Sequence, residues 1–212
     1  MKIDAVVLAK SNMWGSFCVA GVEMRSGRWV RFVGYGDGEP LDDSQMIFIN
    51  DAGSCEPLDA VRVRVAQRIP HKNHSEDCMI ERDAWLKLGR LSIEEVLKIH
   101  EDEEYRFIFG NDREYVTDEE MRELRYRYSL ILVKAENLTL HIERNRENLL
   151  KTRAEFTHHG REYTHIRVTD PEYAVEKESQ SIGLAYLVMS MPVKPFHGRY
   201  YKLAAKILPV NQ

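Results

Sequence analysis

Cysteine is scarce in this chain, and long apolar runs are missing. The 212 residues include three cysteines, Cys18, Cys55 and Cys78. Because their number is odd and none has CxxC spacing, we do not expect a disulfide framework. We expect a reducing cytoplasmic location instead. The longest uncharged apolar-rich run, residues 182–193, is shorter than the roughly 20 residues of a membrane helix. The N-terminus has no apolar signal region. We therefore expect a cytoplasmic protein with no membrane partner.

Signatures of common catalytic sites are also missing. The sequence has no phosphate-binding loop, no glycine-rich dinucleotide turn, no nucleophile elbow and no HExxH helix. His71 and His74, followed by Asp77 and Cys78, are residue types that bind zinc, but no second pair completes four ligands with finger-like spacing. We therefore predict no catalytic residue, no metal and no cofactor.

Charge is distributed unevenly along the chain. The formal net charge is −4, but residues 76–120 hold fifteen acidic and six basic residues, so the flanking sequences are net basic. Residues 122–167 hold ten Lys and Arg against six Asp and Glu, together with four histidines. This asymmetry is compatible with a polyanion-binding surface on the flanks, and equally with a solvated surface of mixed sign.

Strand-like patterns dominate both ends of the chain. In the first 70 residues, apolar runs and alternation predict five strands, at 3–9, 17–22, 28–33, 46–49 and 58–69. From residue 128, they predict five more: 128–142, the two arms of a hairpin within 149–168, 182–190 and 199–208. Five short strands are the number in a barrel of the oligonucleotide/oligosaccharide-binding (OB) type. A sandwich or one mixed domain has a similar count.

Helical spacing separates the two groups of strands. Segments 92–99 and 117–124 each begin with a capping-box signature, Ser92 with Glu95 and Thr117 with Glu120. We therefore predict a mainly β protein with a small α-helical insert: an OB-like five-stranded barrel over 1–75, an acidic helical insert or linker over 76–126, and a second OB-like barrel over 127–212.

Short motifs along the chain carry a family resemblance. They include Leu8-Ala9-Lys10-Ser11, Cys18-Val19-Ala20-Gly21, Gly27-Arg28-Trp29-Val30-Arg31, Val168-Thr169-Asp170-Pro171 and Tyr201-Lys202-Leu203-Ala204-Ala205. In these motifs the sequence resembles the dual OB-containing domain family of bacterial proteins, over nearly its whole length. It departs from the family at Phe32, where a proline is usual, and around residues 71–78. The resemblance implies a pair of OB-type barrels and, by analogy of fold, recognition of nucleic acid or a nucleotide in bacterial defence contexts.

The N-terminal candidates for ligand binding are Lys10, Ser11, Trp29 and Arg31. Trp29 and Arg31 are two residues apart on a predicted strand and therefore share a face. A ring and a guanidinium on one face suit base stacking and phosphate binding. In the alternative interpretation, Trp29 belongs to the core and Arg31 forms a structural ion pair.

The C-terminal candidates are Thr169, Asp170, Arg199, Tyr201 and Lys202. Asp170 either presents an acceptor to a ligand or fixes a turn before Pro171. Arg199 and Tyr201 are expected on one strand face, interleaved with Tyr200 and Lys202, which suits single-stranded nucleic acid or a plain barrel surface.

These residues predict a non-catalytic module that binds single-stranded nucleic acid or a nucleotide, with the candidates gathered in one groove. Two alternatives stay open. One is an adaptor whose acidic middle segment docks a basic partner protein. The other is a metal-dependent enzyme acting on nucleic acid, with carboxylates such as Glu76 and Asp170 holding the metal.

Overall fold

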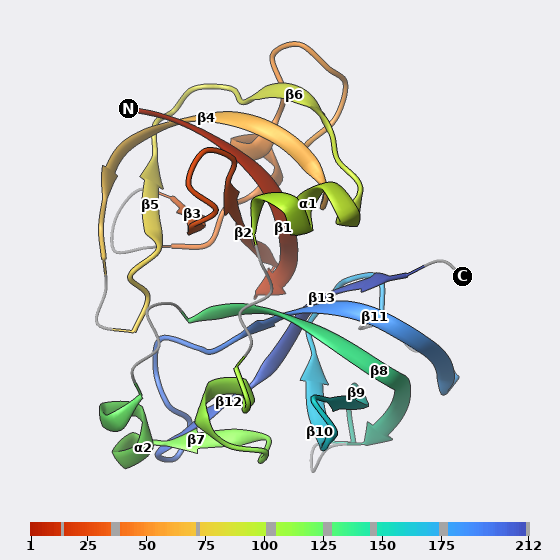
Figure 1. The fold of residues 1–212 in the computed structure, drawn as a ribbon. Coiled ribbons are helices and arrows are strands. Elements are labelled where there is room, and N and C mark those ends of the chain that lie inside the picture. The colour runs from red at the N-terminus through yellow and green to blue at the C-terminus, as the bar shows by residue number, and fades with distance from the viewer. Residues whose placement is uncertain are drawn as a thin grey trace. The chain divides into compact units, whose positions relative to one another are not determined.

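The chain folds into two compact units, Met1–Glu101 (unit 1) and Asp102–Gln212 (unit 2) (Figure 1). The structure is a computed structural model that describes residues 1–13, 15–34, 39–70, 73–100, 105–124, 129–144, 148–173 and 178–210. No helix within these ranges combines the length and the apolar character that crossing a membrane requires.

Unit 1 is a ring of five strands with one strand added at its edge. The strands are β1 (Lys2–Met13), β2 (Ser16–Glu23), β3 (Trp29–Val33), β4 (Asp59–Arg68), β5 (Asp77–Ile80) and β6 (Leu86–Arg90). They lie in the order β1-β2-β3-β5-β4, β4 pairs with β1 to close the ring, and β6 adds to β4. Only the β3–β5 pairing is parallel.

The predicted alternation in β4 accounts for its burial. Val61, Val63 and Val65 all belong to the core of unit 1, whereas Arg64 between them is exposed. The remainder of unit 1 comprises the 3₁₀ helix η1 (Asp43–Met46) and helix α1 (Ile93–Ile99). The predicted capping box of α1 is confirmed, because Ser92 Oγ accepts from Glu95 N and Glu95 Oε2 accepts from Ser92 N.

Unit 2 contains a closed barrel with the same strand order. Its strands are β8 (Leu130–Arg144), β9 (Leu150–His158), β10 (Arg161–Val168), β11 (Gln180–Ser190) and β13 (Leu203–Pro209). They follow each other as β8-β9-β10-β13-β11, and β11 pairs with β8 to close the ring. Again only the third and fifth strands, β10 and β13, pair in parallel. Numbered within each unit, both rings read 1-2-3-5-4, so the prediction of two OB-like five-stranded barrels is confirmed.

A small ribbon and two short helices complete unit 2. The ribbon consists of β7 (Tyr115–Thr117) and β12 (Arg199–Tyr201), and the helices are η2 (Ile108–Gly110) and α2 (Asp118–Glu123). The capping box predicted for α2 is present between Thr117 and Glu120. Ile108, Phe109 and Val116 from this part pack into the barrel core.

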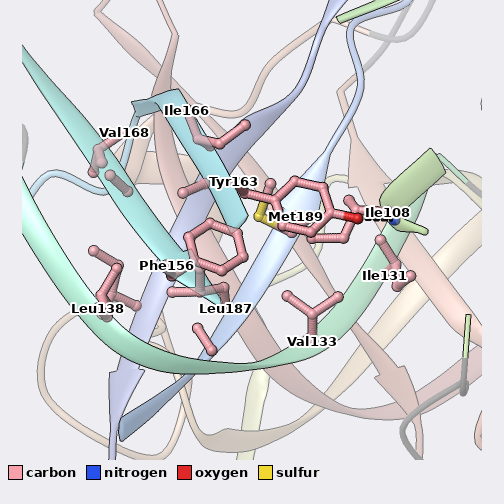
Figure 2. Close-up of a cluster of buried hydrophobic side chains, with 14 of the residues drawn as sticks. Ile108, Ile131, Val133, Leu138, Phe156, Tyr163, Ile166, Val168, Leu187 and Met189 are labelled. Carbon is pink, nitrogen blue, oxygen red and sulfur yellow. Dashed lines mark hydrogen bonds between the residues drawn. The ribbon is translucent and has the colours of Figure 1, made fainter. Parts of the chain in front are cut away.

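A buried hydrogen bond joins the core of unit 2 to the preceding segment. The Tyr163 hydroxyl accepts from the backbone N–H of Ile108 at 3.0 Å (Figure 2). The Tyr163 ring stacks on Phe156 from the neighbouring strand, with ring centroids 5.4 Å apart. Burial of these rings fixes η2 against the inside of the barrel.

Three elements differ from the sequence-based expectations. The predicted strand at 46–49 forms only isolated bridges, and the fifth strand of the first ring is instead β5, beyond the expected boundary at residue 75. The expected insert over 76–126 is divided, because β5, β6 and α1 lie in unit 1 and η2, β7 and α2 lie in unit 2. The predicted strand at 199–208 is interrupted at Lys202. The reason is common to all three: pairing between residues distant in the sequence decides which short runs become ladder strands.

Removing the Tyr163 hydroxyl tests the link between η2 and the barrel. Tyr163→Phe leaves the buried Ile108 N–H without its acceptor, which should lower the free energy of unfolding by about 1–3 kcal/mol. Urea denaturation of the full chain measures the effect. Tyr186→Phe is the matched control, since no hydrogen bond of that hydroxyl is seen within the described residues. Equal losses in the two variants would contradict the assignment.

Candidate functional site

Trp29 lies in the interior of unit 1. Its side chain is 1% exposed, and its ring meets His100 edge-on with centroids 5.1 Å apart. His100, the C-cap of α1, contacts the carbonyl oxygen of Gly27 through Nδ1 at 2.7 Å. A Cβ on Gly27, whose φ is +64°, would lie 2.4 Å from the Ile99 carbonyl oxygen. This close approach brings the end of α1 against Trp29, so the expectation of an exposed stacking ring is wrong for this residue.

Arg31 is used internally. Its Nη2 lies 2.9 Å from Glu76 Oε1 and its Nη1 lies 3.4 Å from Asp77 Oδ1, and all three side chains are buried. The parallel register of β3 and β5 pairs Arg31 with Asp77, which explains the contact. The prediction that Trp29 and Arg31 share a face is confirmed, because Val30 and Phe32 point into the core. That face is covered, however, and Arg31 serves a structural ion pair rather than a phosphate.

The carboxylates around Arg31 form, with His74, the one metal-ligand cluster in the described residues. One ligand atom each from His74, Glu76 and Asp77 lies within 4.8 Å of the others. These are the residues that could hold a metal ion. The Arg31 guanidinium contacts all three, however, so a cationic group already lies among them. Of the sequence pattern that suggested zinc, His71 lies outside the described residues and Cys78 points into the core.

Burial changes the titration of this cluster. Loss of solvent raises the pKa of Asp77 to about 7, with Arg31 opposing the shift and Glu76 adding to it. Burial likewise raises the pKa of the Cys78 thiol to about 11 and that of Cys55 to about 12. Neither thiol is therefore a thiolate at neutral pH, and neither has the character of a nucleophile.

Lys10 and Ser11 are nearly buried near the end of β1. Lys10 Nζ lies 3.1 Å from Glu56 Oε1 and 3.2 Å from Asp43 Oδ1, and it donates to Ser54 Oγ at 3.0 Å. The ammonium also lies over the Phe17 ring, 4.8 Å from its centroid. Two carboxylates compensate this lysine, so it offers little attraction to a further anion.

Asp170 fixes a turn in unit 2. Its carboxylate accepts from the backbone N–H of Ile207 at 2.9 Å and of Glu172 at 3.1 Å, and it pairs with Lys206 at 3.1 Å. The Thr169 hydroxyl donates to the Ala204 carbonyl at 3.5 Å. Asp170 is 1% exposed. These contacts favour the interpretation in which Asp170 fixes a turn, because its acceptor positions hold the 168–171 turn to β13.

Lys202 is also an internal group. It is 1% exposed and donates to the backbone oxygen of Asn111 at 2.6 Å and to Asn111 Oδ1 at 2.9 Å. Its Nζ lies 5.5 Å from the centre of the Tyr163 ring. Burial lowers the pKa of Lys202 to about 7. Lys202 thus lies inside unit 2 and not on the expected strand surface, and its side chain ties the start of β13 to the Asn111 loop.

Arg199 and Tyr201 remain at the surface, on the β7–β12 ribbon. Tyr201 pairs with Tyr115 across the ribbon, and their ring centroids are 5.8 Å apart. The Arg199 guanidinium lies over the Tyr115 ring at 4.4 Å, and that of Arg113 at 5.1 Å. A hydrogen bond to Tyr201 raises the pKa of Arg199. We call these four residues, Arg113, Tyr115, Arg199 and Tyr201, the ribbon cluster.

A second cationic group lies on the outer face of β8, β9 and β10 and was not among the predicted site residues. His141, Arg153 and Arg167 are cross-strand partners in a row over these three strands. His141 is 3.3 Å from Glu155, and Arg153 Nε is 3.3 Å from Glu143 Oε2. We call His141, Arg153 and Arg167 the arginine row.

Within the arginine row, donors remain unsatisfied. Arg153 Nε is buried and lies 3.3 Å from Glu143 Oε2, but it makes no hydrogen bond to any described residue. Arg167 has neither an ion pair nor a hydrogen bond to any described residue. Partial desolvation and the neighbouring Arg153 charge lower the pKa of Arg167. Two guanidinium groups therefore share a surface position with one nearby carboxylate, Glu143.

The sequence contained part of this signal. The excess of basic residues over 122–167 is visible there, but the alternation of β10 places Arg167 on the same side as Tyr163. In the structure, β10 has a β-bulge between Tyr163 and Ile166, with His165 at φ +57°. The bulge turns Arg167 to the side of the sheet opposite Tyr163. Tyr163 thus enters the core while Arg167 points outward.

Both clusters include residues from the surfaces at which OB barrels bind ligands. OB folds use the face of the second and third strands and the loop between the fourth and fifth strands. In unit 2 these are β9, β10 and residues 191–202, which we call the 191–202 loop and which contains β12. Leu203, directly after this loop, pairs with Arg167.

Asp77→Asn tests the buried acid of unit 1. Above pH about 4 the unfolded chain has released the proton that folded Asp77 keeps up to pH about 7. The free energy of unfolding should therefore fall as pH rises through this range, by up to roughly 1.4 kcal/mol per pH unit. Urea titrations should show this fall in the unmodified chain and less of it in Asp77→Asn. An unchanged profile in Asp77→Asn, equal to that of the exposed control Asp83→Asn, would refute this.

Lys202→Met tests the buried base of unit 2. Between pH about 7 and 10.5 the unfolded chain holds a proton that folded Lys202 has lost. The free energy of unfolding should consequently rise with pH over this range. Thermal unfolding at several pH values should show the rise in the unmodified chain and in the exposed control Lys134→Met, but not in Lys202→Met. A rise that persists in Lys202→Met would contradict the assignment.

Comparison with known proteins gives one match. The model of the dual OB-containing domain family matches residues 3–207, nearly the whole chain. The comparison with curated proteins and the comparison with solved structures each gave no match. OB folds are modules for oligonucleotides and oligosaccharides, so the match suggests binding of nucleic acid or another oligomer. With both barrels in place and the match extending across them, the chain belongs to the dual OB-containing domain family.

Proposed function

We propose that unit 2 binds single-stranded nucleic acid and that the arginine row holds its phosphates. The strand would cross β9 and β10 and continue to the 191–202 loop. The function is binding without catalysis, and the ligand is a polynucleotide rather than a free nucleotide. Each part of this proposal rests on side chains within unit 2.

The observation that supports it most is the pair Arg153 and Arg167. Like charges directly opposite each other on a sheet are destabilising, yet these two residues are cross-strand partners on an outer face. Arg167 has no carboxylate partner in the described part of the chain. A phosphate between the two guanidinium groups would relieve the repulsion and satisfy their donors, since arginine binds phosphate in a bidentate manner.

The ribbon cluster supports a polymer rather than a single anion. Arg199 and Arg113 add two exposed cations in the same unit, beside the rings of Tyr115 and Tyr201. Cations that follow a backbone and rings that meet bases are the combination found in single-strand binding. A nucleotide would need only one of the two clusters.

Among the described residues, the third strand of unit 1 offers no equivalent open surface. On its third strand, Trp29 and Arg31 are buried under His100 and the 74–77 segment. The chain's own carboxylates contact Arg31 where a ligand phosphate would otherwise be expected. The two barrels thus share a fold while differing in which groups the third strand leaves available.

Neutralising the arginine row tests the proposal. In the double variant Arg153→Gln/Arg167→Gln, affinity for a labelled oligothymidylate of about 12 nucleotides should fall. The dependence of log K on log salt should also become less steep by about 1.4, since each phosphate contact contributes about 0.7 for single strands. Fluorescence anisotropy at several salt concentrations measures both quantities.

Arg64→Gln is the matched control for this experiment. Arg64 is also an exposed arginine on a strand, but it belongs to unit 1 and pairs with Asp83 at 3.1 Å. Its affinity and salt dependence should equal those of the unmodified chain. If the double variant binds the oligothymidylate as the control does, the arginine row is not the phosphate site.

A further inference from the structure

The 191–202 loop has an unusual composition for this chain. It contains no acidic residue, although the chain as a whole is net negative, and it carries two exposed cations, Lys194 and Arg199, while Lys202 at its end is buried. Residues 194–199 are all exposed. The loop therefore offers a cationic surface with nothing in its own sequence to neutralise it.

The tip of the loop is a tight, preorganised turn. Phe196 and Arg199 exchange backbone hydrogen bonds of 2.9 and 3.1 Å across His197 and Gly198. Both central residues have positive φ, +50° and +71°, as in the two-residue turns of hairpins. Gly198 adopts this conformation without strain, whereas His197 does so at a steric cost. The turn fixes the direction in which the flanking side chains project.

Phe196 is the aromatic side chain that this turn presents to solvent. It is 66% exposed, and no other aromatic is among the exposed large apolar side chains of the described residues. Its ring meets His197 edge-on, with centroids 4.3 Å apart, so its faces are not stacked on that neighbour. The Tyr115 ring, by contrast, is already flanked by Arg113 and Arg199.

The tip lies within reach of the arginine row. Arg199, which closes the turn, is four residues before Leu203, and Leu203 pairs with Arg167. At about 3.3 Å per residue and about 5 Å between strands, the backbones of Arg199 and Arg167 are at most roughly 18 Å apart. A strand of several nucleotides covers such a distance.

We propose that Phe196 stacks on an unpaired base of the strand whose phosphates the arginine row holds. This inference rests on the proposed function and makes the ligand specifically one with unstacked bases. The cationic flanks favour a nucleic acid over an apolar protein partner, because the exposed Lys194 and Arg199 lie on either side of Phe196 in the sequence and the loop supplies no acid. A base contacts the ring while the backbone remains near these cations.

The experiment compares Phe196→Leu with the unmodified full chain on two probes. One is the oligothymidylate of about 12 nucleotides, and the other is an abasic deoxyribose-phosphate oligomer of equal length. Loss of one stacking contact should weaken binding of the oligothymidylate roughly 5- to 150-fold, the equivalent of about 1–3 kcal/mol. Binding of the abasic oligomer should not change. Because leucine is apolar but not aromatic, it preserves the hydrophobic character of the tip.

Phe196→Trp provides a direct spectroscopic readout in the same full chain. Compared with the unmodified chain, it should retain affinity for the oligothymidylate and show additional fluorescence quenching when that strand is added. The abasic oligomer should cause no such quenching.

The outcomes separate the inference from the proposed function. If Phe196→Leu binds both probes as the unmodified chain does while the double arginine variant is weakened, the stacking role is wrong and the phosphate site stands. Equal weakening for both probes would also overturn the inference, since it would mean a disturbed loop. If the double arginine variant binds normally, the proposed function itself fails.

Discussion

Each barrel contains a parallel pairing of its third strand with its fifth strand, and the residues on either side of this pairing decide which groups the third strand leaves exposed. In unit 1, β3 meets β5, and the register brings Asp77 and the preceding Glu76 onto Arg31. In unit 2, β10 meets β13, and the register brings Leu203 beside Arg167. The same pairing therefore gives Arg31 carboxylate partners, whereas Arg167 has no carboxylate partner among the described residues.

The loop that leads into the fifth strand reinforces this difference. In unit 1 its end supplies His74 and Glu76, which lie buried around Arg31. In unit 2 the corresponding 191–202 loop has no acid and keeps Lys194, Arg199 and Phe196 at the surface. The buried Lys202 anchors the end of that loop through two hydrogen bonds to Asn111. Two units of one fold thus differ in whether the arginine of the third strand is covered or exposed.

Sequence patterns predicted the architecture better than the site. Alternation identified β4, and capping boxes identified α1 and α2, because these signals depend on residues close in the sequence. The four-residue strand β5 was not predicted, because it depends on pairing with β3, which lies more than 40 residues earlier in the sequence. Without β5, the partners of Arg31 could not be inferred. The pattern of Trp29 and Arg31 therefore predicted an exposed face for base stacking and phosphate binding. The bulge at His165 has no local sequence signal either, and strict alternation along β10 would place Arg167 on the same face as Tyr163.

The central claim, that unit 2 and not unit 1 carries the open face, is tested most directly by NMR. Amide resonances of the isotope-labelled full chain would be followed while an oligothymidylate is added at low salt. The account predicts shifts concentrated in β9, β10 and residues 194–199, with the β3 amides and the Trp29 indole unmoved. Shifts centred on β3 and Trp29, with β9 and β10 unchanged, would contradict it.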